Sequence, residues 1–290
     1  MADLIAARDH ADFEERTPIG FSGDELREWW ARRPEHQEKN ALVAVSEGHV
    51  VGYASVDQEG SDLANVVDES CVHPDYRSRG IGTRLVEFAE ACARERELSR
   101  LHMHAVTDEG RRLFESRRFE HIRFFWRMEV EFEGEPPLPE PPAGFEIRAY
   151  EPGTDDAALY AMHQAAFAEH WEFSPQSLED WLQWRTTRGD YDPALWQLVV
   201  HGDEIAGAAL AFGGRSFGWV LDLAVSPRRR KQGLGLALLQ AVFRELYTRG
   251  FTHVGLEVDS QNETGATRLY ERAGMRVTRR YETFEKRLSA

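Results

Sequence analysis

Residues 217–258 carry a strand pattern, then a helix pattern, then a second strand pattern. Residues 217–225 form a short and mostly apolar run, which is typical of a buried strand. After a polar segment, apolar side chains recur every three to four positions and predict a long helix that Gly250 ends. Residues 253–258 then alternate in the manner of a strand. The helical positions are Leu234, Leu238, Ala241, Val242 and Leu246.

The rest of the second half predicts further elements of both kinds. Polar or glycine-containing turns separate short apolar runs from longer segments with helical spacing. The predicted elements are a strand at 145–149, helices near 155–167 and 177–184, strands at 194–201 and 204–212, a short helix at 263–273 and a closing strand to 284.

The first half repeats these signals at a nearly constant spacing. Pro74 and Gly82 precede Pro227 and Gly235 by 153 residues each, and residues 110–119 align with 266–275 at a step of 156. The first half is therefore three residues shorter between the two blocks, and a duplication is the simplest explanation. It begins at or just before a helix, so we expect its opening strand to be absent or supplied by another part of the chain. Its helix stripe is Ile81, Leu85, Phe88, Ala89 and Cys92.

The densest cluster of prolines divides the two halves. Five prolines between 136 and 142, followed by Gly144, favour an extended connector because proline fixes φ and lacks a donor. A chain of 290 residues with 42% apolar side chains can bury two cores. We therefore predict domains at 1–134 and 144–290 with a linker at 135–143.

Charge and composition exclude several functions. A formal charge of −15 argues against a broad nucleic-acid footprint, which needs many cations facing phosphates. Cys71 and Cys92 fit neither a disulfide framework nor a metal site, so we interpret both as reduced core residues and predict no metal. A basic apolar leader and a membrane-spanning run are both missing, which predicts a soluble, cytoplasmic protein without a membrane partner.

The junction between the strand at 217–225 and the following helix can bind an anion. Gly233 and Gly235 let the backbone approach a ligand, and the unpaired N–H groups of the first helical turn favour a pyrophosphate. The four cations at 228–231 add charge-assisted contacts. The alternative is a glycine-rich turn beside a solvated basic run. Recurrence of the motif in the first half favours binding, and its spacing matches neither a P-loop nor a dinucleotide fingerprint.

This junction resembles the pyrophosphate signature of the GNAT N-acetyltransferase family, Gln/Arg-x-x-Gly-x-Gly/Ala. The resemblance implies an α/β (α+β) fold with two tandem domains, each a mixed, mostly antiparallel sheet flanked by helices. It also implies acetyl-CoA as cofactor and a primary amine of a small molecule as acceptor. The matching residues are Arg230, Lys231, Gln232, Gly233, Leu234 and Gly235, with Leu223, Ala224 and Val225 on the preceding strand, and Arg77, Arg79, Gly80, Ile81 and Gly82 in the first copy.

A second family motif resembles residues 256–275. The resemblance implies that Asn262 contacts the pantetheine or nearby backbone and that the Tyr270 hydroxyl faces the thioester sulfur. The departing thiolate needs a proton, and a phenol of ordinary pKa near 10 keeps one at neutral pH. We therefore predict that Tyr270 is the general acid. The alternative is a tyrosine that packs on the core edge of a helix.

The first copy lacks the residues that match Tyr270 and Asn262. Phe114 aligns with Tyr270 and has no proton to give, and the three-residue deletion removes any counterpart of Asn262. We expect the first copy to be catalytically silent, so that it either binds acetyl-CoA as a fixture or braces the other copy.

The general base that deprotonates the acceptor is expected to be a carboxylate. Some family members use a carboxylate on the strand before the glycine turn, where Asp222 stands here and Glu69 in the first copy. Apolar neighbours would raise the pKa of Asp222 by burial and suit it to that task. Glu257 is a weaker candidate. The alternative for Asp222 is a structural carboxylate.

The resemblance implies that acceptor groups come from the first two helices and nearby loops, which here carry several aromatic residues. These side chains could wall an amphipathic or cationic substrate, although spacings such as that of Trp181 and Trp184 also suit a core. Protein N-acetylation and non-catalytic acyl-CoA sensing remain open, as does the choice between monomer and homodimer. The candidate residues are His163, His170, Trp171, Phe173, Trp181 and Trp184, with Trp29 and Trp30 in the first half.

Overall fold

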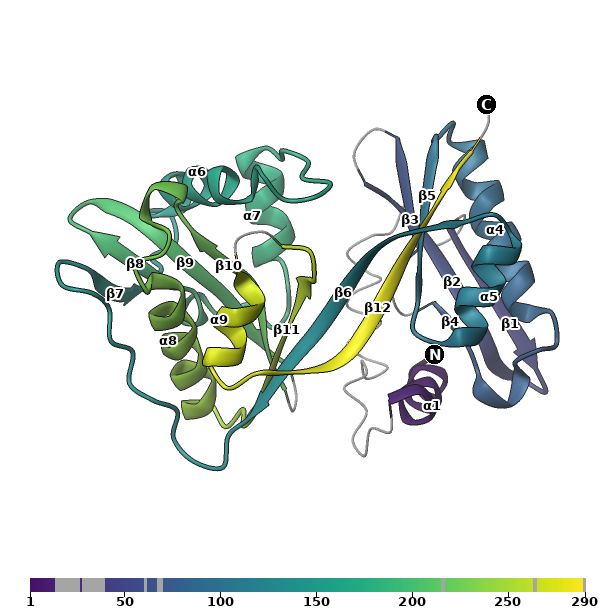
Figure 1. Cartoon of the computed structure of the whole chain (residues 1–290), viewed down its shortest axis with the longest axis horizontal. Helices are drawn as coiled ribbons and strands as arrows, with labels where there is room; N and C mark the ends of the chain where they lie inside the picture. The colour runs from purple at the N-terminus through teal and green to yellow at the C-terminus, as the bar shows by residue number, and fades with distance from the viewer. Residues whose placement is uncertain are drawn as a thin grey trace. The chain divides into compact units, whose positions relative to one another are not determined.

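The computed structural model describes residues 1–13, 27, 40–59, 62–66, 70–214, 217–262 and 265–288. It divides into two compact units (Figure 1). The first unit holds Met1–Phe125 with Arg279–Ala290, and the second holds Trp126–Thr278. No helix in the described part of the chain is long and apolar enough to cross a membrane.

The first unit is a mixed sheet with helices, and its last strand comes from the end of the chain. The strand order is β1-β2-β3-β5-β12, with β4 beside β2. Strand β12 runs antiparallel to β5 and places Phe284 opposite Met103. Phe284 is fully buried in the core beneath α4 and α5. The elements are α1 (Ala2–Phe13), β1 (Ala41–Ser46), β2 (His49–Glu59), β3 (Leu63–Val66), β4 (Cys71–Val72), α4 (Ile81–Glu95), β5 (Arg100–Ala105), α5 (Asp108–Ser116) and β12 (Arg276–Arg287).

The second unit places helices on both faces of its sheet. The strand order is β6-β11-β10-β9-β8-β7. Alternate residues of β9 show the two faces, because Ala209 packs in the core with α8 and α9, whereas Leu210 packs in the core with α6 and α7. The elements are β6 (Glu120–Glu131), β7 (Glu146–Ala149), α6 (Asp156–Phe167), α7 (Leu178–Thr186), β8 (Gln197–His201), β9 (Glu204–Gly213), β10 (Gly218–Val225), α8 (Leu234–Thr248), β11 (His253–Asp259) and α9 (Ala266–Arg272).

Most predicted elements of the second half are present within a few residues of their expected bounds. The strand expected at 194–201 begins only at Gln197, because Pro193–Leu195 forms a single 3₁₀ turn. Gly250 does follow the long helix, with a left-handed φ of 90°. The fold class is confirmed, since the sheets are mostly antiparallel and carry flanking helices.

The compact units differ from the halves drawn from the sequence. Strands β6 and β12 each begin in one unit and end in the other, so the chain changes unit at Phe125 and again at Thr278. The proline-rich segment 135–143 has neither helix nor strand and lies within the second unit. The first half does receive a strand from another part of the chain. That strand is β12, and it lies beside β5 and not at the opening position of the first half.

Each unit contains a pair of parallel strands with a short register. In the second unit, the β10–β11 register covers Gly218 with Val254 and Trp219 with Gly255. Within the described residues, the later part of β10 has its ladder partner in β9 alone. In the first unit, the β3–β5 register stops at Asn65 and His102. The sheet of the second unit therefore opens along β10, the strand that leads into the glycine turn.

Candidate active site

The glycine turn of the second unit has a fixed backbone geometry. Pro227–Arg229 makes a 3₁₀ turn, Lys231 has a φ of 63°, and Gly233 caps helix α8 with φ 87° and ψ −3°. A glycine cap has no side chain to accept a bond from the first-turn N–H groups. These donors and the positive end of the helix dipole therefore suit an anion.

The first unit repeats this backbone within a few degrees. Ser78 has a φ of 59°, and Gly80 caps helix α4 with φ 84° and ψ −3°. The loop residues Lys231 and Gln232, like Arg79, are exposed, and the Arg79 guanidinium lies 4.8 Å from the centre of the Tyr76 ring. The loop of the first copy therefore keeps its backbone geometry although Phe114 stands where the second copy has Tyr270.

The second glycine of each motif allows two helices to approach. A Cβ at Gly235 would lie 2.7 Å from Leu269 Cδ1 on α9, and a Cβ at Gly82 would lie 3.1 Å from Leu113 Cδ2 on α5. The helix that carries Tyr270 or Phe114 therefore packs directly on the glycine turn. Leu234 and Ile81 begin the two long helices beside these glycines.

The signature arginines bind carboxylates of the protein. Arg230 donates from Nη1 to Glu169 Oε2 at 2.8 Å and from Nη2 to the Ala166 carbonyl at 3.0 Å. Arg77 donates to both carboxylate oxygens of Asp12 at 2.7 Å. In both units the arginine thus ties the glycine turn to the end of the unit's first helix.

Asp222 lies in a buried ion pair. Its Oδ2 accepts from Arg185 Nε at 3.1 Å and Nη2 at 2.9 Å, and His163 Nε2 lies 3.1 Å from the same oxygen. Burial alone raises the pKa of this carboxyl, but the charge of Arg185 and the contact with His163 outweigh burial and lower the pKa to about 2. The expectation of a raised pKa is wrong, because it counted the apolar neighbours in sequence and not the cation contributed by α7.

Tyr270 is buried where α9 meets the core of the second unit. Burial, and secondly the negative charge of Asp222, raise the pKa of the Tyr270 hydroxyl above its ordinary value. The phenol therefore stays protonated at neutral pH and can donate. Leu223 and Val225 pack against the same core, while Ala224 faces α6 and α7.

The other predicted residues separate into core and surface. Trp181 is fully buried and donates from Nε1 to His163 Nδ1 at 3.3 Å, whereas Trp184 is 43% exposed. Glu257 is exposed on β11. The backbone N–H of Asn262 donates to the Asp259 carbonyl at 3.1 Å, which fixes the turn after β11. Trp29, Trp30 and Glu69 lie outside the described residues.

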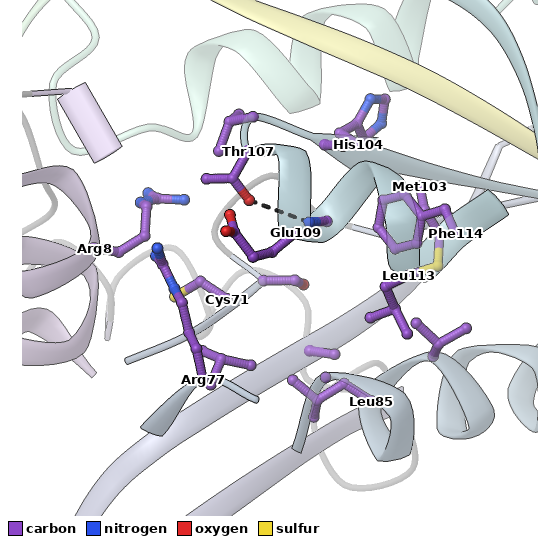
Figure 2. Close-up of a pocket in the computed structure, with 18 of the residues that line it drawn as sticks. Arg8, Cys71, Arg77, Leu85, Met103, His104, Thr107, Glu109, Leu113 and Phe114 are labelled. Carbon is purple, nitrogen blue, oxygen red and sulfur yellow. Dashed lines mark hydrogen bonds between the residues drawn. The ribbon is translucent and has the colours of Figure 1, made fainter. Parts of the chain in front are cut away.

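The first unit has a cavity of about 290 Å³ beside its glycine turn. Figure 2 shows Arg8, Arg77 and Glu109 around one part of it, with Leu113 and Phe114 around another. Neither cysteine forms a disulfide, and Cys92 belongs to the core of the first unit. Cys71 is half-buried and lines this cavity, so the prediction of two core cysteines is wrong for Cys71.

Comparison with known proteins agrees with this geometry. The model of the acetyltransferase (GNAT) family matches residues 5–118 and again residues 157–275. The chain belongs to the GNAT acetyltransferase family. It is an acyltransferase with two GNAT repeats, of a family that uses acetyl-CoA as co-substrate.

The curated relatives include mycothiol acetyltransferases. That of Thermobispora bispora is 36% identical over 71% of this chain and 71% of its own length, and that of Geodermatophilus obscurus is 30% identical over 81% and 78%. A GCN5-related N-acetyltransferase from Sphaerobacter thermophilus has a TM-score of 0.84 and 33% identity over all of this chain and 92% of its own. A tandem GNAT protein from the clavulanic acid biosynthesis pathway, at TM-score 0.75 and 18% identity over all of this chain and 94% of its own, shares the fold.

Proposed function

We propose that the second unit transfers an acetyl group from acetyl-CoA to a primary amine of a small molecule, by direct attack within a ternary complex. The observation that carries this is the protonated, buried Tyr270 on a helix that packs against the glycine turn. A phenol held there can give its proton to the thiolate as the C–S bond breaks.

The donor would lie along the turn and the open edge of β10. First-turn N–H groups around Gly233 and Gly235 would bind the pyrophosphate, with Lys231 and Gln232 beside it. The backbone of 223–225 and Asn262 would contact the pantetheine arm. Because Glu169 and Ala166 already hold Arg230, we assign it to positioning the turn.

We propose that the first unit holds an acyl-CoA and does not transfer it. Its glycine turn keeps the same backbone, and a cavity lies beside that turn. Phe114 lines this cavity at the position of the general acid and cannot donate. We also retain residues 1–134 and 144–290 as the two copies of the duplication. The two matches to the family model fall on either side of the proline-rich segment, which supports this division.

The acceptor is proposed by chemical class alone. The relatives named mycothiol acetyltransferases support a small molecule over a protein. The exposed Trp184 and the buried Arg185 belong to α7, the helix whose Arg185 pairs with Asp222 on β10.

The decisive experiment combines an acceptor screen with calorimetry. The purified chain would be incubated with acetyl-CoA and cysteine methyl ester, glucosamine, phenethylamine or a peptide with a free N-terminus, and N-acetyl products would be counted by mass spectrometry. We expect acetylation of at least one small amine and two acetyl-CoA sites. Gly233→Glu should abolish turnover and acetyl-CoA binding in the second unit. Gly80→Glu should abolish acetyl-CoA binding in the first unit.

Other outcomes separate the alternatives. Acetylation of the peptide alone would favour a protein N-acetyltransferase. Binding of acetyl-CoA without any acetylated product would favour a non-catalytic sensor.

A further inference from the structure

A stack of three rings runs from the Asp222 ion pair to the loop after α6. The rings of His163 and His170 both lie against Phe167, with centroids 4.4 Å and 4.3 Å away. His163 Nε2 lies 3.1 Å from Asp222 Oδ2, so the stack starts at a fixed point on β10. The backbone N–H of His170 donates to the Phe167 carbonyl at 2.8 Å, which holds the other end of the stack.

The glycine turn fixes the same segment from the other side. Arg230 donates to the Ala166 carbonyl and to the Glu169 carboxylate, the residues just before Phe167 and His170. His170 is therefore bracketed by the turn that would bind the donor and by β10, along which the thioester would lie.

The two histidines of the stack differ in what they can do. His163 is buried, accepts a bond at Nδ1 from Trp181 and presents Nε2 to Asp222, so neither nitrogen can take a proton from a substrate. His170 is half-buried, and its ring has no hydrogen-bond partner among the described residues. Only His170 keeps a nitrogen available.

Charges from several elements act on His170. Burial and then the nearby Arg230 cation lower the pKa of its imidazole, the carboxylates of Asp259 and Asp222 raise it, and His163 lowers it. The net effect is a pKa below the ordinary value. The adjacent Glu169 carboxylate is paired with Arg230. His170 is consequently neutral at pH 7, as a base must be.

We propose that His170 accepts the proton that the acceptor ammonium must lose before it attacks; this inference rests on the proposed function. One N–H bond of the ammonium breaks, and its proton passes to the imidazole and then to solvent. The free amine forms the C–N bond at the thioester carbonyl, and the C–S bond breaks. Tyr270 gives its proton to the departing sulfur and regains one from the new amide nitrogen, so the products are amide, thiol and one released proton.

Asp222 cannot easily fill this role. Its carboxylate already accepts from Arg185 and faces His163, and a carboxyl with a pKa of about 2 is a weak base toward an ammonium. Its function is to hold His163, and through His163 the ring stack, in place. Asp222 is thus a positioning residue.

The test compares His170→Gln with wild type, using the amine of the screen that wild type acetylates fastest. We expect kcat/KM for the amine to fall about 100-fold or more at pH 7, with KM for acetyl-CoA within twofold. The wild-type profile should show an acidic limb below the ordinary histidine pKa. The variant should instead rise with pH up to the pKa of the amine, because only free amine then reacts. His201→Gln, an exposed histidine on β8, is the matched control.

Further measurements make each outcome informative. Added imidazole should restore part of the activity of His170→Ala, which a purely structural role would not allow. Retained activity in His170→Gln, an unchanged pH profile, or a matching loss of acetyl-CoA affinity by calorimetry would overturn the proposal. Failure of wild type to acetylate any amine would instead count against the proposed function.

Discussion

The two glycine turns have nearly the same backbone but different chemical surroundings. Gly80 and Gly233 cap their helices with φ of 84° and 87°, and Ser78 and Lys231 adopt the same left-handed conformation before them. The helix packed on each turn carries Phe114 in one unit and Tyr270 in the other. Anion binding depends on backbone geometry, whereas proton transfer depends on one side chain, so a duplicated unit can keep the first and lose the second.

The surroundings of the two turns differ in a second respect. Across the open edge of β10, the second unit places the buried group of Asp222, Arg185 and His163. The cavity of the first unit is lined by a different polar group, the Arg77–Asp12 ion pair with Arg8, His104 and Glu109, and by apolar residues that include Phe114. Both units therefore have a polar group near the turn, and the second unit differs in carrying the Tyr270 hydroxyl where the first has Phe114.

The largest expected effect concerns the hydroxyl that separates the two units. Tyr270→Phe should lower kcat by about 100-fold or more with little change in KM for acetyl-CoA, because only departure of the thiolate needs the proton. Steady-state kinetics on the fastest amine measures this. Tyr247→Phe on α8 makes the same change away from the turn and should leave kcat unaltered.

The converse variant sharpens the comparison. Adding Phe114→Tyr to Tyr270→Phe should not restore turnover, since the first copy also lacks a counterpart of Asn262. If Tyr270→Phe kept full activity while Gly80→Glu abolished it, the roles of the units would be reversed.

Next in size is the cost of neutralising Asp222 in the buried ion pair of the second unit. Asp222→Asn leaves the buried Arg185 cation without its partner and should lower the free energy of unfolding of the second unit by about 3–5 kcal/mol. Urea denaturation measures this. Asp190→Asn breaks the more exposed pair with Arg188 and should cost less than about 1 kcal/mol.

The Asp222→Asn variant also distinguishes a positioning role of Asp222 from a catalytic role. If Asp222 only positions His163, Asp222→Asn should retain the acidic limb of the rate profile. Loss of that limb, with the limb of His170→Gln intact, would return the base role to Asp222.

Low pH should destabilise the second unit by protonating Asp222. Its pKa is about 2 when folded and about 3.9 when unfolded, so the unfolded chain binds the proton more tightly. The stabilisation is complete above about pH 5 and is lost as the pH falls through 2, by about 3 kcal/mol in all. Unfolding free energies between pH 6 and 2 test this, and a slope in Asp222→Asn as steep as in wild type would contradict it.

Local sequence patterns predicted the parts of the site that are local in the chain. The two turns, their helices and the contrast between Phe114 and Tyr270 each depend on residues within one motif. The state of Asp222 depends on Arg185, 37 residues away on α7, and no spacing in the sequence indicates that pair. The pairing of β12 with β5 is equally non-local, because a strand's own pattern specifies which face is buried and not which strand lies beside it.

The smallest effect concerns the arginine that ties each turn to its first helix. Arg77 bonds both oxygens of Asp12, whose side chain is 5% exposed, whereas Glu169 beside Arg230 is 70% exposed. Arg77→Gln leaves a buried carboxylate without its cation and should destabilise α1 by about 1–3 kcal/mol, but Arg230→Gln should cost α6 about 1 kcal/mol or less. Hydrogen exchange read separately on peptides from α1 and α6 measures both. If the two variants lost the same amount of hydrogen-exchange protection, burial of the carboxylate would not determine how strongly the arginine stabilises its helix.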